Sequence, residues 1–200
     1  MKNILQINTS LFSSGGESSR LAARFVERLR SMEPGSSLTI RDLGSEPLPH
    51  LSAEHFAAFG AGATERTPEQ RRLVAQSDAL IAEIRAADVI ALAVPMYNFG
   101  VPSTLKAYFD HIARAGETFR YTNAGPVGLL KGKKAYVFST RGGIHAGTPT
   151  DLQTDYLRLF LGFLGINDVE FVFAEGIALG ADRRAAAVAE AEARIDRLAA

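Results

Sequence analysis

Three stretches of this 200-residue chain have side chains suited to holding a ligand, and each comes directly after a short apolar run. The first stretch, residues 9–20 (TSLFSSGGESSR), is rich in hydroxyl groups and glycines and continues into an amphipathic segment. Free N–H groups at the start of a helix, together with serine hydroxyls, suit a phosphate monoester. The alternative interpretation is that these serines and glycines only form a turn and cap the helix.

The second stretch, residues 95–100 (PMYNFG), places a methionine, two aromatic rings and an asparagine at the end of a buried run. Exposed apolar side chains are costly in such a position unless something covers them. A planar aromatic ligand would cover them, with Asn98 and backbone groups recognising its polar edge. The alternative is that Tyr97 and Phe99 pack on the neighbouring helix.

The third stretch, residues 140–147 (TRGGIHAG), contains paired glycines, which let a backbone approach a ligand closely. Arg141 and His145 are its strongly polar side chains. A phosphate at the first stretch and a flat ring between the second and the third fit flavin mononucleotide (FMN), although this pattern is not unique to FMN.

Motifs of several other sites do not occur in the sequence. There is no G-x-x-x-x-G-K-[ST], and no G-x-G-x-x-G follows the first apolar run, which argues against a P-loop and against the usual dinucleotide fold. There is no G-x-S-x-G, so hydrolase chemistry is set aside. The histidines at 50, 55 and 111 stand isolated without metal-ligand spacing and there is no cysteine, so we expect no bound metal.

Composition narrows the class of protein further. The 22 basic residues balance the 22 acidic ones, so the protein has no net positive charge that would attract nucleic acid. No apolar run approaches the roughly 20 residues that span a bilayer, and residues 1–8 do not form a signal peptide. An apolar fraction of 46% and a charged fraction of 22% are typical of a globular protein. We expect one cytoplasmic domain, residues 1–200, that binds neither nucleic acid nor membrane.

Alternating strands and helices must position the three stretches. Short apolar runs bounded by polar residues predict strands buried on both faces at Asn3–Asn8, Ser37–Leu43, Asp88–Val94, Lys134–Ser139 and Asp168–Ala174. Helical spacing separates them, at 21–32, from Thr67-Pro68 onward, at 102–115, from Thr148-Pro149 to Gly165, and from Asp182.

This alternation predicts an α/β fold with a doubly wound, five-stranded parallel sheet, strand order 2-1-3-4-5, and helices on both faces. The three stretches then lie outside the carboxyl ends of strands one, three and four, where ligands bind in such sheets. The irregular segment Glu46–Arg66 is expected to be a partly helical insertion. Its His55, Phe56 and Phe59 have no obvious place in the core.

Several segments together resemble the bacterial FMN-dependent NADH-azoreductases, also called FMN-dependent NADH:quinone oxidoreductases. The likeness runs from the first strand to the last helix, and its segments are 95–99 (PMYNF), 114–121 (RAGETFRY), 141–145 (RGGIH), 160–163 (FLGF) and 171–176 (FVFAEG). It implies a flavodoxin-like homodimer with one FMN per subunit and active sites at the subunit interface. It also implies FMN contacts at Ser10, Gly16, Glu17, Ser18, Met96, Tyr97, Asn98, Phe99, Thr140, Arg141, Gly142 and Gly143.

Two of these positions depart from the family pattern. Thr140 replaces a serine, which keeps the hydroxyl. Glu17 stands where the family often has an uncharged residue, and a carboxylate beside a phosphate is unfavourable. We therefore expect Glu17 to offer its backbone N–H and to turn its side chain to solvent. The resemblance further implies that Tyr121 and Phe163 line the place of flat substrates, although Phe163 alone is equally consistent with a helix core.

The activity that follows from the resemblance is ping-pong reduction of quinones and azo compounds by NADH through FMN. His145 is the candidate proton donor, with a purely structural role as the alternative. Other activities are a flavin reductase or nitroreductase-like enzyme and a flavodoxin-type electron carrier. Flavodoxins are usually strongly acidic, so a net charge of zero argues against the carrier. The segment that covers the partner's flavin is expected to be Glu46–Arg66 or the loop Glu117–Leu130.

Overall fold

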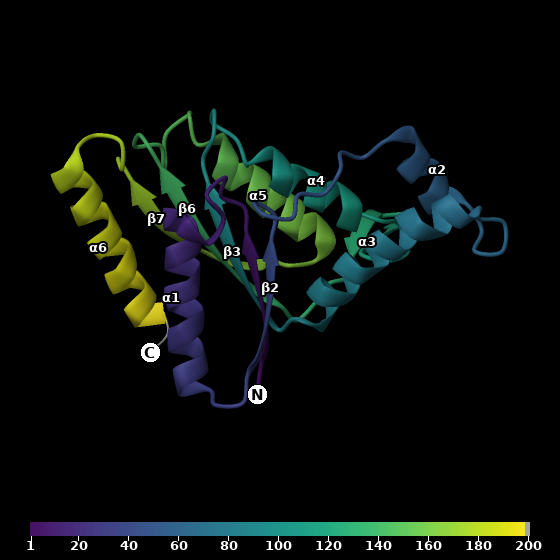
Figure 1. Cartoon of the computed structure of the whole chain (residues 1–200), viewed down its shortest axis with the longest axis horizontal. Helices are drawn as coiled ribbons and strands as arrows, with labels where there is room; N and C mark the ends of the chain where they lie inside the picture. Colours follow the sequence, from purple (N-terminus) through teal and green to yellow (C-terminus); the bar gives the residue numbers. More distant parts are fainter. Residues whose placement is uncertain (199–200) are drawn as a thin grey trace.

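The computed structural model describes residues 1–198 and contains a five-stranded parallel sheet between two layers of helices (Figure 1). Each of the five predicted strands is present, with ends shifted by two residues at most. The strands of the sheet are β1 (Asn3–Asn8), β2 (Ser37–Asp42), β3 (Val89–Pro95), β6 (Lys134–Arg141) and β7 (Asp168–Glu175).

A small hairpin separates the third and fourth strands of the sheet along the chain. It consists of β4 (Phe119–Thr122) and β5 (Gly125–Gly128), which form a separate two-stranded antiparallel sheet. The prediction did not include this hairpin, so the expected order 2-1-3-4-5 does not hold in the chain's own numbering. The observed order is β2-β1-β3-β6-β7, with all neighbours parallel.

The helices cover both faces of the sheet (Figure 1). On one face lie α1 (Glu17–Met32) and α6 (Ala181–Leu198), and on the other lie α3 (Pro68–Ala86), α4 (Ser103–Ile112) and α5 (Leu152–Leu164). Successive residues of β3 alternate between the two cores: Ala91 packs toward α1, and Leu92 packs toward α4 and α5. Because both faces are covered, β3 is buried at all seven positions, which explains its continuous apolar run.

The two predicted helix starts have different outcomes. Helix α3 begins after Thr67, whose side chain and that of Gln70 form a reciprocal capping box, as expected. The start predicted at Thr148-Pro149 is wrong. Helix α5 begins at Leu152 because Asp151 accepts a hydrogen bond from the N–H of Thr154 at 3.1 Å and serves as the N-cap.

The insertion between β2 and α3 is partly helical, as predicted, and carries α2 (Ala53–Gly60) at one end of the molecule (Figure 1). The expectation that its large side chains lack a place in the core holds only for Phe56, which is 76% exposed. His55 is buried, and Phe59 packs beside Ala58 and α3 under the guanidinium of Arg114, 4.9 Å from the ring centre.

Two of the three histidines expected to be isolated are in contact. The rings of His55 and His111 lie edge to face with centres 4.9 Å apart, and Nε2 of His111 bonds to the carbonyl of Pro49 at 2.9 Å. Burial, together with the neighbouring His111, lowers the pKa of His55. Within residues 1–198 no three acidic, histidine or cysteine side chains gather as a metal site would require, and no helix is both long and apolar enough to cross a membrane.

Candidate active site

The three predicted stretches meet at the carboxyl edge of the sheet, where they form loop 1 (residues 9–16), loop 2 (residues 96–102) and loop 3 (residues 142–151). The N–H of Leu11 donates to the Tyr97 hydroxyl at 3.3 Å, which joins loops 1 and 2. The rings of Phe99 and His145 lie edge to face with centres 5.7 Å apart, which joins loops 2 and 3. The sheet therefore brings together the three loops that the sequence predicts to bind a ligand.

Loop 1 folds back closely on itself before α1. A Cβ atom at Gly16 would lie 2.2 Å from Oγ of Ser10, so only glycine lets these two segments meet. Ser10 is buried and its Oγ accepts from the N–H of Phe12 at 3.2 Å. Two separate parts of the predicted phosphate site are thus held against each other.

The start of α1 offers polar groups without partners. Ser18 and Ser19 are each 1% exposed, and neither hydroxyl has a hydrogen-bond partner among the described residues. The cap residue Gly16 has no side chain to satisfy the N–H groups of the first turn. A buried hydroxyl and free N–H groups at a helix start fit an anionic acceptor such as a phosphate.

The expectation that the Glu17 side chain turns to solvent is wrong. Its carboxylate lies 2.7 Å from the guanidinium of Arg184 on α6, and only 13% of the side chain is exposed. This pair compensates the negative charge at the point where a phosphate would bind. The partner is 167 residues away along the chain, so local sequence gave no sign of it.

Loop 2 has an unusual backbone. Asn98 and Phe99 have φ angles of 50° and 65°, a left-handed region that non-glycine residues rarely adopt. The flanking residues Tyr97 and Gly100 exchange backbone hydrogen bonds of 3.2 and 3.0 Å, which makes a tight turn. The alternative packing of Phe99 on the next helix does not apply, because 52% of Phe99 is exposed.

Loop 3 is attached through its carbonyl groups. The carbonyls of Arg141, Gly142 and Gly143 accept from the N–H groups of residues 176–178 at 2.8–3.1 Å. A Cβ atom at Gly143 would lie 2.9 Å from Nε2 of His145, so the paired glycines make room for the imidazole. His145 itself bonds through Nδ1 to the Thr150 hydroxyl at 2.9 Å.

Arg141 points away from the loops and into the protein. Its side chain is fully buried, lies 2.9 Å from Asp151 and 3.2 Å from Glu175, and stacks over the ring of Phe173. Glu175 also accepts from the N–H groups of His145 and of the next residue, both at 2.9 Å. The side chain of Arg141 thus fixes the position of loop 3, and only its main chain remains for a contact with FMN.

Sequence reasoning missed two residues at this edge. Gln153 on α5 is 1% exposed and donates hydrogen bonds to the carbonyl of Pro95, at the end of β3, and to that of Gly100 in loop 2. His50 lines a cavity of about 550 Å³ that Asn98 and Phe99 also line. A second cavity of about 620 Å³ lies between Leu11, loop 2 and the start of α4. No motif marks Gln153 or His50, because each acts beside segments far away in the sequence.

Tyr121 and Phe163 do not join the three loops within one subunit. Tyr121 on β4 is 74% exposed and lines a hollow of about 330 Å³ with Phe56. The ring centres of Phe163 and Phe119 lie 4.4 Å apart, and Phe119 lines the same hollow as Tyr121. Loop 2 precedes α4 and this hollow follows it, so the length of α4, about 15 Å, separates them.

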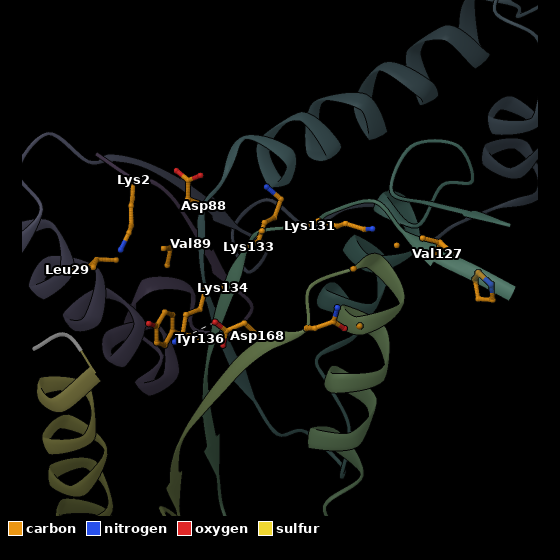
Figure 2. A pocket seen from close by; sticks show the side chains of 16 residues that line it. Lys2, Leu29, Asp88, Val89, Val127, Lys131, Lys133, Lys134, Tyr136 and Asp168 are labelled. Atoms are coloured by element: carbon orange, nitrogen blue, oxygen red, sulfur yellow. Dashed lines mark ion pairs between the residues drawn. The ribbon is translucent and has the colours of Figure 1, made fainter. Parts of the chain in front are cut away.

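A further hollow, of about 890 Å³, opens at the amino ends of the strands, and lysines border it (Figure 2). These lysines point in different directions and most have partners. Lys2 pairs with Glu33 at 2.6 Å, and Lys133 donates to two carbonyls at the end of α3. The ammonium groups do not converge on a common point, so this hollow is not the candidate active site.

Comparison with known proteins agrees with the geometry of the carboxyl edge. A family model described as flavodoxin-like fold matches residues 2–199. A protein of Burkholderia lata called FMN-dependent NADH:quinone oxidoreductase 6 is 54% identical over 195 residues, which are 98% of each chain. The chain belongs to the family of FMN-dependent NADH:quinone oxidoreductases. The FMN-dependent NADH:quinone oxidoreductase of Cellvibrio japonicus is 52% identical over 96% of both chains.

The resemblance to this oxidoreductase family is thus confirmed, and solved structures extend it. An FMN-dependent NADH-azoreductase from Bacillus anthracis, in complex with FMN, superimposes with a TM-score of 0.87 at 27% identity over 100% of both chains. The residues of this family member fit FMN on three points. Ser18 has a buried hydroxyl without a partner among the described residues, Gly16 lets Ser10 lie directly beside the start of α1, and Gly143 lets the His145 imidazole lie against the backbone of loop 3.

Proposed function

We propose that the protein is a cytoplasmic FMN-dependent NADH:quinone oxidoreductase that also cleaves aromatic azo compounds by reduction. The observation that carries the proposal is the meeting of three loops at one sheet edge, with an unpartnered Ser18 hydroxyl at the start of α1. The names of the relatives support the same activity.

FMN, when bound, supplies the redox chemistry, by taking a hydride from NADH and delivering electrons to the acceptor. The chain's own residues would hold FMN and orient its ring. Ser10, Gly16 and Ser18, with the N–H of Glu17, would bind the phosphate, and Met96–Phe99 and Thr140–Gly143 would flank the ring. N–H groups at Gly142 and Gly143 would stabilise negative charge on the ring's pyrimidine edge. Donor and acceptor use one place in turn, which gives ping-pong kinetics.

His145 would hold the proton that the reduced acceptor needs. Thr150 fixes Nδ1, so Nε2 is the atom that faces Gly143. Tyr156, which lines the neighbouring cavity, does not compete for this role, because burial, with the nearby Asp110, raises its pKa to about 12. Imidazole is the side chain that most often serves as a general acid in enzymes.

The decisive experiment is stopped-flow reduction of the purified flavoprotein by NADH and by NADPH, followed by mixing with menadione and an azo dye. We expect rapid bleaching of the flavin near 450 nm and rapid reoxidation by both acceptors. A protein that carries flavin but does not turn over NADH would be an electron carrier. A colourless protein that binds no FMN would refute the proposal.

A homodimer completes the proposed site. Tyr121 and Phe163 lie about 15 Å from loop 2 along the same subunit, so they would line an acceptor only in the partner's site. Leu152 and Leu159 on the outer face of α5 are 62% and 74% exposed, apolar area that a second copy would cover. Either α2 or the β4–β5 hairpin would then reach over the partner's flavin.

Replacement of Phe56 by serine tests this arrangement. We expect the Michaelis constant for the acceptor to rise by about tenfold or more, because covering a phenylalanine contributes about 1.5–3 kcal/mol. Stability should change by less than about 0.5 kcal/mol, since Phe56 is exposed in the subunit. Phe59→Ser is the comparison, and it should mainly destabilise because Phe59 is packed. A fully active monomer in analytical ultracentrifugation at the assay concentration would exclude the dimer.

Replacement of Ser18 by alanine tests the phosphate site. We expect FMN to bind more weakly by about 1–3 kcal/mol, the range for one hydrogen bond to a charged group. Riboflavin, which lacks the phosphate, should bind the variant almost as well as the wild type. Flavin fluorescence titrations measure both. Equal losses for the two flavins would show that Ser18 does not meet the phosphate.

A further inference from the structure

Gln153 is a buried polar side chain of α5 that binds the backbone on both sides of the tight turn in loop 2. Its Nε2 donates to the carbonyl of Pro95 at 3.0 Å and to the carbonyl of Gly100 at 3.1 Å. A side-chain amide has two N–H groups, and here both are used. With 1% of the residue exposed, water cannot substitute for either bond.

The segment between these two carbonyls is the strained part of loop 2. Asn98 and Phe99 occupy the left-handed region, and such residues persist only where the surrounding structure holds them. Gly100 is held twice, because its carbonyl accepts from the N–H of Tyr97 as well as from Gln153. Gln153 is therefore part of what keeps the turn in this conformation.

The same side chain connects loop 2 with loop 3. Its Oε1 accepts from the Ser139 hydroxyl at 2.8 Å, and Nε of Arg141 donates to that hydroxyl at 3.2 Å. Arg141 in turn binds Glu175, which accepts from the N–H groups of loop 3. A continuous buried chain of hydrogen bonds thus runs from one loop to the other.

From this geometry we infer that Gln153 is a positioning residue that sets the spacing of loops 2 and 3 for the flavin ring. The inference rests on the proposed function, because it is FMN whose ring would lie between these loops. None of the hydrogen bonds of Gln153 involves loop 1 or the start of α1. Its effect should therefore fall on the ring of the flavin and leave the phosphate untouched.

Gln153→Met keeps the length of the side chain and removes its hydrogen bonds. We expect FMN and riboflavin to bind the variant more weakly by the same factor, about tenfold or more, since two buried carbonyls lose their donor. The circular dichroism of the bound flavin should change. In the protein without flavin, amide hydrogen exchange over residues 96–101 should become faster. This pattern differs from that of Ser18→Ala, which spares riboflavin.

Leu157→Ala is the matched control, because Leu157 is buried on the same helix and packs only in the core. It should lower the melting temperature and leave flavin affinity and loop exchange unchanged. Ser139→Ala removes the hydroxyl that joins Gln153 to Arg141, and with it two bonds of the chain. It should weaken the binding of both flavins to a smaller degree than Gln153→Met, and it tests the inference if Gln153→Met does not fold. Wild-type affinity for both flavins in Gln153→Met and Ser139→Ala, or a loss of affinity for FMN alone, would overturn the inference. A wild-type protein that binds no flavin would instead overturn the proposed function.

Discussion

Replacing Arg141 with methionine is expected to lower the free energy of unfolding by about 3–5 kcal/mol, the cost of removing one partner from a buried ion pair. Arg141 lies between Asp151 and Glu175, whose side chains are 9% and 14% exposed. Without the guanidinium, both carboxylates lose their buried counter-charge in a place that water barely reaches. Urea denaturation of the two flavin-free proteins at pH 7 measures the difference.

The pH dependence of this loss follows from Asp151. Burial raises its pKa, but hydrogen bonds from Arg141 and Thr154 outweigh burial and hold the pKa below the ordinary 3.8. A depressed pKa contributes stability above the unfolded-state pKa, and this contribution disappears as the pH falls through the folded-state pKa. In Arg141→Met burial acts without the guanidinium, so Asp151 takes up a proton at higher pH. The deficit of the variant should therefore shrink between pH 7 and pH 4.

Arg158→Met provides the control for Arg141→Met. Arg158 is exposed and stacks over Phe171 at 4.6 Å, so its loss should cost about 0.5–1 kcal/mol with little dependence on pH. An Arg141→Met variant no less stable than this control, or a deficit equally large at pH 4, would contradict the buried ion pair as the cause.

Replacing His145 with glutamine is expected to reduce quinone turnover about 10²-fold or more, while NADH still reduces the flavin rapidly. Glutamine keeps a hydrogen-bond donor near Gly143 but cannot release or take up a proton at neutral pH. Stopped-flow traces of the two half-reactions separate the effects. Both halves should retain their rates if His145 only fixes loop 3.

His50→Gln is the comparison for His145, since His50 lines the cavity beside Phe99 and is the other imidazole at this edge. A larger loss of quinone turnover in His50→Gln would show that His50, and not His145, is the proton donor. The ratio of the two losses identifies the donor, whichever acceptor is used.

The sheet could be predicted because the burial of each strand is visible in its own residues. All seven positions of β3 are apolar and buried, and the start of α3 is determined by Thr67 and Gln70, three residues apart. The start of α5 was misplaced because Thr148-Pro149 has the same local pattern. Asp151 supplies the cap instead, held by Arg141, and that contact depends on the packed sheet.

The candidate site was predictable as a set of loops, but the direction of its side chains was not. Composition and position placed Ser18, Asn98 and Gly143 at the carboxyl edge. The inward turn of Arg141 depends on Glu175, a strand away. Gln153 occupies the first turn of an amphipathic helix, where a polar residue is ordinarily exposed, so its burial against Pro95 became visible only in three dimensions.

The pair formed by Glu17 and Arg184 has a consequence for the order of events during synthesis. A ribosome completes Gly16–Ser18 early, but the counter-charge of Glu17 arrives 167 residues later, on the last helix. Until Arg184 has been synthesised, Glu17 lacks this counter-charge beside the Ser18 hydroxyl that would bind the FMN phosphate in the proposed site. Because Arg184 lies on the last helix, the ion pair with Glu17 can form only after nearly the whole chain has been synthesised.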